Sequence, residues 1–163
     1  MNDDVLLEIK DLKISFPLDE GVVRAVEGVN LTVRRGEVLG VVGESGCGKT
    51  VTAQSVLRII PPPGRIEAGQ ILFHPAGGSA SANSSGVVDL ASLNPTGEEI
   101  RRIRGNHIAM IFQEPMSSFS PVHTIGSQID EAILLHQNVS KTKARETTVE
   151  LLQLVGISGA EQR

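Results

Sequence analysis

The sequence has no tryptophan, no tyrosine and only one cysteine among its 163 residues. A single cysteine excludes an intrachain disulfide and is typical of proteins in a reducing cytosol. Because only four phenylalanines are present, the core must be built mainly from valine, isoleucine and leucine. This composition favours an α/β protein whose parallel strands are runs of branched aliphatic residues.

The sequence also lacks a net positive charge and long apolar runs. The formal net charge of −4 disfavours a nucleic-acid partner, because such partners usually require a basic stripe. No apolar run approaches the roughly 18 residues that span a bilayer, and residues 1–4 lack the basic start of a signal peptide. Any membrane role would therefore act through a partner protein. What is present, 40% apolar and 21% charged residues, is typical of one globular domain.

The spacing of apolar residues predicts several strands. Spaced apolar positions predict strands over 5–16 and 22–33, and a further strand is expected over 66–73. Two continuous aliphatic runs, 38–42 and 108–112, have the composition of strands that are buried on both faces.

Helices are expected between and after these strands. The first covers 49–60 and ends at three consecutive prolines. A short helix up to about 104 is expected to begin with a capping box of Thr96 and Glu99. Helical spacing then predicts a helix over 125–136 and a final one over 144–155, capped by Ser140 and stopped by Gly156. The Gly- and Ser-rich stretch 74–86 is predicted to be a flexible surface insertion.

The most specific signal is a match to the phosphate-loop pattern G-x-x-x-x-G-K-[ST], between a predicted buried strand and a predicted helix. Its glycines let backbone N–H groups turn toward phosphate, and the helix directs its positive dipole end there. A chance match in this chain has a probability of roughly 1% from average composition. We expect Lys49 to reach the β- and γ-phosphates and Thr50 to hold Mg²⁺. The expected nucleotide contacts are Gly43, Glu44, Ser45, Gly46, Cys47, Gly48, Lys49, Thr50 and Val51.

Cys47 lies inside this loop and allows two interpretations. A helix N-terminus favours the reactive thiolate form of a cysteine, so a reactive thiol is possible. We favour the simpler interpretation, a small side chain that the loop tolerates.

A phosphate loop alone is compatible with a GTPase, a kinase or a motor, so the flanking residues decide. Residues 23–29 (Val-Arg-Ala-Val-Glu-Gly-Val) and 35–46 (Arg-Gly-Glu-Val-Leu-Gly-Val-Val-Gly-Glu-Ser-Gly) resemble the start of an ABC ATPase domain. Residues 108–116 (Ile-Ala-Met-Ile-Phe-Gln-Glu-Pro-Met) resemble its Q-loop strand. The stretch 102–126 is similar to the ATPase subunits of dipeptide and oligopeptide importers, some of which handle nickel. A non-transport P-loop NTPase would require this last similarity to be accidental.

The resemblance covers essentially the whole chain except 74–86, and it implies a fold and a function. The fold would be the α/β core of a P-loop NTPase of the ABC ATPase type. An antiparallel β flank would lie at its N-terminus and the start of a helical subdomain would follow, so 1–163 would form an incomplete domain. The function would be that of an ATP-binding subunit that powers peptide import at the cytoplasmic face of the bacterial inner membrane, with ATP and Mg²⁺. The implied partners are transmembrane permease subunits, a second ABC ATPase subunit (identical or different) and, indirectly, an extracytoplasmic solute-binding protein.

The resemblance also suggests roles for single residues. Gln113 would be the Q-loop glutamine, which meets Mg²⁺ or the attacking water, so Gln113 and Lys49 are the catalytic candidates. Phe16 resembles the aromatic residue that stacks on adenine, with a core strand residue as the alternative. Val51 replaces a threonine that contacts the α-phosphate in many members, which leaves only its backbone contact. Residues 116–136 would lie in or near the subdomain that docks the permease, where Met116 and Phe119 are more typical of a core.

Three motifs of the family are absent from these residues. They contain no Leu-Ser-Gly-Gly-Gln-like signature, no Walker B strand that ends in Asp-Glu and no switch histidine after it. The resemblance therefore implies that residues 1–163 alone hydrolyse little or no ATP, and that their incomplete sheet exposes an edge and is poorly stable. The alternative is a truncated, non-hydrolysing module that binds nucleotide or another protein.

Overall fold

The computed structural model describes residues 4–75, 86–114 and 119–162. These residues form two compact units, Met1–His107 and Ile108–Arg163, and each unit is described by itself. Of the predicted insertion at 74–86, residues 76–85 lie outside the described part, so its flexibility stays a prediction.

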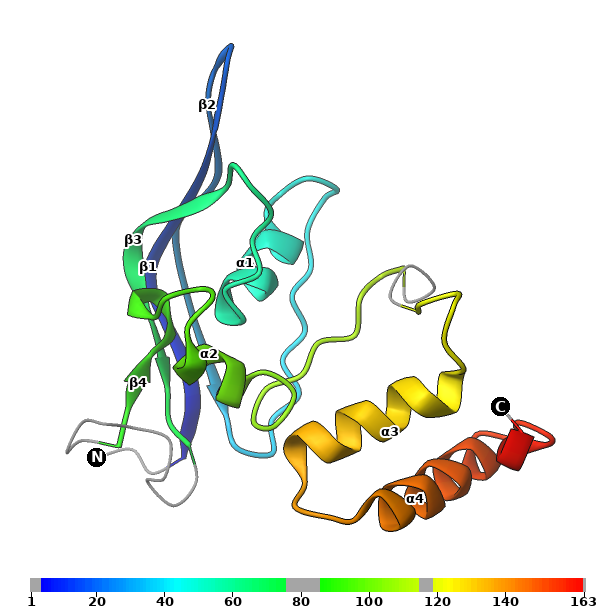
Figure 1. Ribbon diagram of the computed structural model, residues 1–163. Helices are drawn as coiled ribbons and strands as arrows, with labels where there is room; N and C mark the ends of the chain where they lie inside the picture. Colours follow the sequence, from blue (N-terminus) through cyan, green and yellow to red (C-terminus); the bar gives the residue numbers. More distant parts are fainter. Residues whose placement is uncertain (1–3, 76–85, 115–118, 163) are drawn as a thin grey trace. The chain divides into compact units, whose positions relative to one another are not determined.

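The first unit contains a four-stranded sheet in the order β2-β1-β3-β4, and all its strand pairs are antiparallel (Figure 1). The three long strands confirm the sequence predictions to within two residues at each end. The two-residue strand β4 was not predicted. The strands are β1 Val5–Leu18, β2 Gly21–Arg34, β3 Arg65–Phe73 and β4 Val88–Asp89.

One face of this sheet supplies the core of the first unit. Leu12, Ile14 and Ile71 are almost completely inaccessible to solvent, and each such side chain contributes about 1.5–3 kcal/mol relative to an exposed one. Two short helical segments, η2 (Leu90–Ser92) and α2 (Glu98–Ile103), add further buried residues. These additional core residues are Leu90, Ile100 and Ile103.

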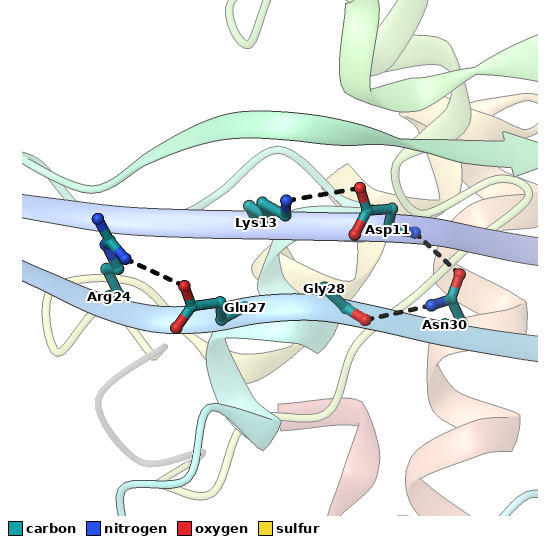
Figure 2. A network of polar contacts seen from close by, with 6 residues as sticks. All are labelled: Asp11, Lys13, Arg24, Glu27, Gly28 and Asn30. Carbon is teal, nitrogen blue, oxygen red and sulfur yellow. Dashed lines mark hydrogen bonds and ion pairs between the residues drawn. The ribbon is translucent and has the colours of Figure 1, made fainter.

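The pairing of β1 with both its neighbours is irregular around Asp11. Asp11 in β1 has a φ of +44° and Gly69 in β3 a φ of +97°, and the pairing register shifts on both sides of β1 there. A Cβ atom on Gly69 would lie 2.6 Å from the carbonyl oxygen of Asp11, so only glycine fits. Figure 2 shows the polar contacts beside it: the Asp11 N–H donates to Asn30 Oδ1 (2.9 Å), and Asn30 Nδ2 donates to the carbonyl of Gly28 (3.1 Å). These bonds satisfy backbone groups that the irregular pairing would otherwise leave unpaired.

The prediction of buried strands over 38–42 and 108–112 is wrong in this structure. Neither segment forms a regular strand, and Val38, Val42 and Ile111 are 97%, 96% and 94% exposed. A strand exists only through backbone hydrogen bonds to a neighbouring strand. Aliphatic composition indicates that a segment can be buried, but it does not provide that neighbour.

Helix α1 covers Lys49–Val56 and is shorter than predicted. It ends before the prolines because Leu57 is its C-cap and Arg58 adopts a left-handed conformation with φ +55°. The capping box predicted for α2 is also wrong. Gly97 is the N-cap, with no side-chain bond, and the Thr96 hydroxyl donates to Asn94 Oδ1 instead (3.0 Å).

The second unit is a pair of packed helices, α3 (Ile125–His136) and α4 (Lys141–Leu154), followed by the short segment η4 (Ala160–Gln162). The predicted cap is confirmed, because Ser140 Oγ accepts from the N–H of Lys143 (3.2 Å). Gly156, with φ +79°, ends α4 as predicted. Among the described residues, no helix combines the length and the apolarity needed to cross a membrane.

Candidate functional site

The phosphate loop, residues 43–50, leads directly into α1, and two of its glycines have left-handed backbone angles. Gly46 has φ +82° and Gly48 has φ +92°, which other residues adopt only with strain. Gly48 is the N-cap of α1, and its carbonyl accepts from the N–H of Thr52 (2.8 Å). A Cβ atom on Gly48 would lie 2.4 Å from the carbonyl oxygen of Ala25 in β2. Glycine therefore permits both the turn and the close approach of the loop to the sheet.

Lys49 folds its side chain back into this loop. Its Nζ donates to the carbonyl oxygens of Gly43 (2.8 Å) and Glu44 (2.6 Å) and lies 3.4 Å from Cys47 Sγ. An ammonium group has three donors, and the three loop atoms use all of them. Phosphate oxygens would be stronger, charge-assisted acceptors than these carbonyls, so the arrangement suits the capture of an anion.

Gly43 gives the loop room to close around that side chain. A Cβ atom there would lie 2.7 Å from Cys47 Sγ and 3.9 Å from Lys49 Nζ. Cys47 itself is exposed, and its N–H donates to the carbonyl of Glu44 (3.4 Å). The thiol therefore lies in the loop, next to Gly43 and the Lys49 ammonium group.

The start of α1 adds donors beside the lysine. The first N–H groups of a helix have no intrahelical acceptors, and the helix dipole makes this end positive. Thr50 and Val51 are the second and third residues of α1, with Thr50 exposed and Val51 half-buried. Glu44 and Ser45 are also exposed. Lys49 and the free N–H groups at the start of α1 thus lie side by side in the sequence at the positive end of the helix.

The two remaining candidates lie elsewhere in the chain. Phe16 lies in β1 opposite Val23 of β2 and is half-buried. Its ring packs on Gly64, where a Cβ atom would lie 2.4 Å from Phe16 Cε1. Gln113 is exposed in the second unit, in a segment without regular secondary structure, whereas Phe16 and the phosphate loop belong to the first unit.

Two arginines at the other end of α1 were not predicted from the sequence. Arg104 Nε donates to the carbonyl of Leu57 (2.7 Å), and its Nη2 donates to the carbonyls of Arg58 (3.0 Å) and Pro95 (2.9 Å). Arg58 Nε donates to the carbonyl of Leu93 (3.2 Å). Burial lowers the pKa of both guanidinium groups, and the charge of Arg104 lowers the pKa of Arg58 further. Spacing could not reveal these contacts, because they join residues that lie far apart in the sequence.

A separate pocket of about 420 Å³ lies on strands β1, β2 and β3. The Ser15 hydroxyl donates to Glu67 beside it, and this bond is the main reason that the pKa of Glu67 is lowered. None of the predicted site residues lines this pocket, so it is distinct from the phosphate loop. Its polar lining residues are Lys13, Ser15, Arg24, Glu27 and Glu67.

Comparison with known proteins identifies the family. Residues 26–163 match the family described as ABC transporter. The chain is 44% identical over 161 residues to the probable peptide ABC transporter ATP-binding protein y4tR of Sinorhizobium fredii, covering 98% of this chain and 44% of that protein. It is also 44% identical over 159 residues to the oligopeptide transport ATP-binding protein OppD of Bacillus subtilis, covering 97% of this chain and 40% of OppD. The chain thus spans less than half the length of these relatives.

Solved structures agree with this family at the level of the fold. The dimeric structure of MJ0796, a bacterial ABC transporter cassette, superposes with a TM-score of 0.72 at 18% identity, over 91% of this chain and 56% of that one. A structure of MJ0796 described as a post-hydrolysis state bound to ADP and Pi gives a TM-score of 0.71 over the same shares. The expected α/β fold of the ABC ATPase type is therefore confirmed, although two of its aliphatic segments are not strands here. On both the sequence match and the fold, the chain belongs to the ABC transporter family.

Proposed function

We propose that this chain carries the phosphate-binding half of an ATP site and belongs to an ATP-binding subunit that powers peptide import. Two kinds of support converge. The phosphate loop has left-handed glycines, which suit an anion-binding turn, and it holds the side chain of Lys49 against its own carbonyls. The relatives, by their names, are ATP-binding proteins of peptide transport.

In this proposal the loop works by exchanging hydrogen-bond partners. Lys49 would release the carbonyls of Gly43 and Glu44 and donate to phosphate oxygens instead. The glycine angles at Gly46 and Gly48 let the backbone N–H groups face the same phosphates without strain. Binding therefore needs little rearrangement of the loop, because its turn is already formed.

An exposed hydroxyl at the start of α1 suits a nucleotide that carries Mg²⁺, and the family resemblance adds a glutamine. Thr50 would offer its hydroxyl to the ion, and Gln113 its side-chain amide to the ion or to water. Bound Mg²⁺ would neutralise charge on the phosphates during transfer. Phe16 would contact the adenine with the part of its ring that does not pack on Gly64.

The proposal extends to hydrolysis, partners and location. Hydrolysis would need a second ATPase subunit that completes the site, and MJ0796 is described as a dimer in its own structure. We place the subunit at the cytoplasmic face of the inner membrane, docked on permease subunits that receive peptide from a solute-binding protein. Residues 1–163 by themselves should turn over little ATP, because they contain neither a signature motif nor a strand that ends in Asp-Glu.

The position of Lys49 inside the glycine loop is the single observation that carries this function. Titration calorimetry with Mg-ATP tests it in the full-length protein. We expect Lys49→Ala to weaken binding about 100-fold or more, because the loop loses its only side-chain cation. Lys10→Ala is the matched control, since Lys10 is a surface lysine of β1 that pairs with Glu8 (2.9 Å). Equal affinities for the Lys49→Ala and Lys10→Ala proteins would refute the phosphate site.

A further inference from the structure

Helix α1 is held at its C-terminal end by two arginines that reach in opposite directions. Arg104, just after α2, donates to the carbonyls of Leu57 and Arg58 at the end of α1. Arg58 reaches the other way and donates to the carbonyl of Leu93. We call this pair, Arg58 and Arg104, the arginine clasp.

The clasp satisfies carbonyl groups of the turn that follows α1, because Leu57 is the C-cap and Arg58 comes after it. Inside the end of α1, the carbonyls of Ser55 and Gln54 already accept from the N–H groups of Arg58 (3.0 Å) and Ile59 (3.1 Å), and the helix dipole makes this end negative. A guanidinium supplies several donors in a rigid fork together with a positive charge. Arg104 uses one edge of this fork, because its Nε donates to the carbonyl of Leu57 and its Nη2 donates to the carbonyls of both Arg58 and Pro95.

The clasp is not an ordinary surface ion pair. Among the described residues, neither Arg58 nor Arg104 forms an ion pair with a carboxylate. Both side chains are half-buried, and burial lowers the pKa of each. Backbone carbonyls thus hold two guanidinium groups at a cost in desolvation and in like-charge repulsion, which the charge of Asp89 opposes at Arg58.

Helix α1 is itself buried mainly at its C-terminal end, where its cap Leu57 is also buried. Only Ser55 and Val56 are buried among its eight residues, and the Ser55 hydroxyl donates within the helix, to the carbonyl of Thr52 (2.6 Å). At its start, Gly48 lies against Ala25 of β2. The contact at Gly48 therefore holds the start of α1, and the arginine clasp holds its C-terminal end.

We propose that Arg104 is a positioning residue for the phosphate loop, because it fixes the far end of the helix that begins at Lys49. This inference rests on the proposed nucleotide site. Loss of the clasp would leave the carbonyls of Leu57 and Arg58 without their donors and let α1 tilt about Gly48. The donors at the start of α1 would then meet the phosphates in poorer geometry, and small misplacements of binding groups are costly.

Fluorescence titration of the full-length protein with N-methylanthraniloyl-ATP and Mg²⁺ tests this role. We expect Arg104→Ala to raise the Kd about five- to tenfold, and Arg104→Lys to raise it about two- to threefold, because lysine keeps the charge but loses the fork. Arg102→Ala is the matched control, since Arg102 pairs with Glu98 on the exposed side of α2 (2.5 Å). Its Kd should equal that of the unmodified protein.

The titration separates positioning from mere support of the fold. A residue that only supports folding would lower the fraction of binding-competent protein while leaving the Kd of that fraction unchanged. An unchanged Kd in both Arg104→Ala and Arg104→Lys overturns the proposal. If Arg104→Ala does not fold, the Kd of Arg104→Lys decides alone. Failure of the proposed function gives a different result, because the unmodified protein would then bind no better than Lys49→Ala.

Discussion

The antiparallel sheet and the segment 38–50 are both rich in aliphatic residues, but they differ in how far these residues are buried. In the sheet, Ile14 and Ile71 are buried and every long strand has a partner. In 38–50, equally aliphatic residues such as Val38 and Val42 face solvent, and the loop is shaped by glycine angles and the bonds of Lys49. Stability should therefore reside mainly in the sheet and binding mainly in the loop.

The largest expected effect tests the sheet side of this comparison. Leu12 is fully buried in β1, so Leu12→Ala should lower the free energy of unfolding by about 2–5 kcal/mol through lost burial and a cavity. Val42→Ala, in an exposed aliphatic residue, should change it by less than about 0.5 kcal/mol. Urea denaturation followed by circular dichroism measures both. Similar losses in the two variants would show that 38–42 is buried after all.

A smaller effect tests the loop side. Gly48→Ala places a methyl group where the φ is +92° and the carbonyl of Ala25 would be 2.4 Å away, which should cost about 1–3 kcal/mol and weaken Mg-ATP binding. Gly36→Ala is the control, because Gly36 also has a positive φ (+71°) but has no atom within 4 Å of the added Cβ position. Titration calorimetry should show weakened binding for Gly48→Ala alone. Equal binding by both variants would mean that contact with β2 does not position the loop.

The smallest effect concerns Phe16, which lies in strand β1 of the sheet and is predicted to contact the adenine of the nucleotide. Phe16→Leu keeps most of the packing on Gly64 and removes the aromatic ring, so the affinity for Mg-ATP should fall by about 0.5–1.5 kcal/mol. The free energy of unfolding should change by less than about 1.5 kcal/mol. Calorimetric titration and urea denaturation of the same sample compare the two. A loss of stability with unchanged affinity would make Phe16 a core residue only.

Much of the fold was predictable where a local pattern suffices. The strands of the sheet followed from the spacing of their apolar residues, and α4 followed from Ser140 and Gly156. The capping box of α2 failed because Thr96 bonds to Asn94, a competing local partner that spacing does not rank. The strands expected over 38–42 and 108–112 failed for a different reason, since their pairing depends on distant residues.

The candidate site divides in the same way. The phosphate loop was predictable from its motif, and the structure adds the glycine angles and the hydrogen bonds of Lys49 within it. The arginine clasp was not predictable from the sequence, because Arg104 comes into contact with Leu57 and Arg58 only in the folded chain. Gln113 stays a prediction from the resemblance, as does the adenine contact of Phe16.

By itself, the sequence determined the features that depend on neighbouring residues: the alternation of β1 and β2, the glycine-rich loop before α1 and the cap at Ser140. It also carried the family resemblance that the comparisons confirmed. Only the tertiary structure decided which aliphatic segments are buried, how closely Gly48 approaches β2 and what holds the far end of α1. The physical reason is that φ preferences and helix caps are local, whereas burial and long-range hydrogen bonds require partners that only the folded chain brings together.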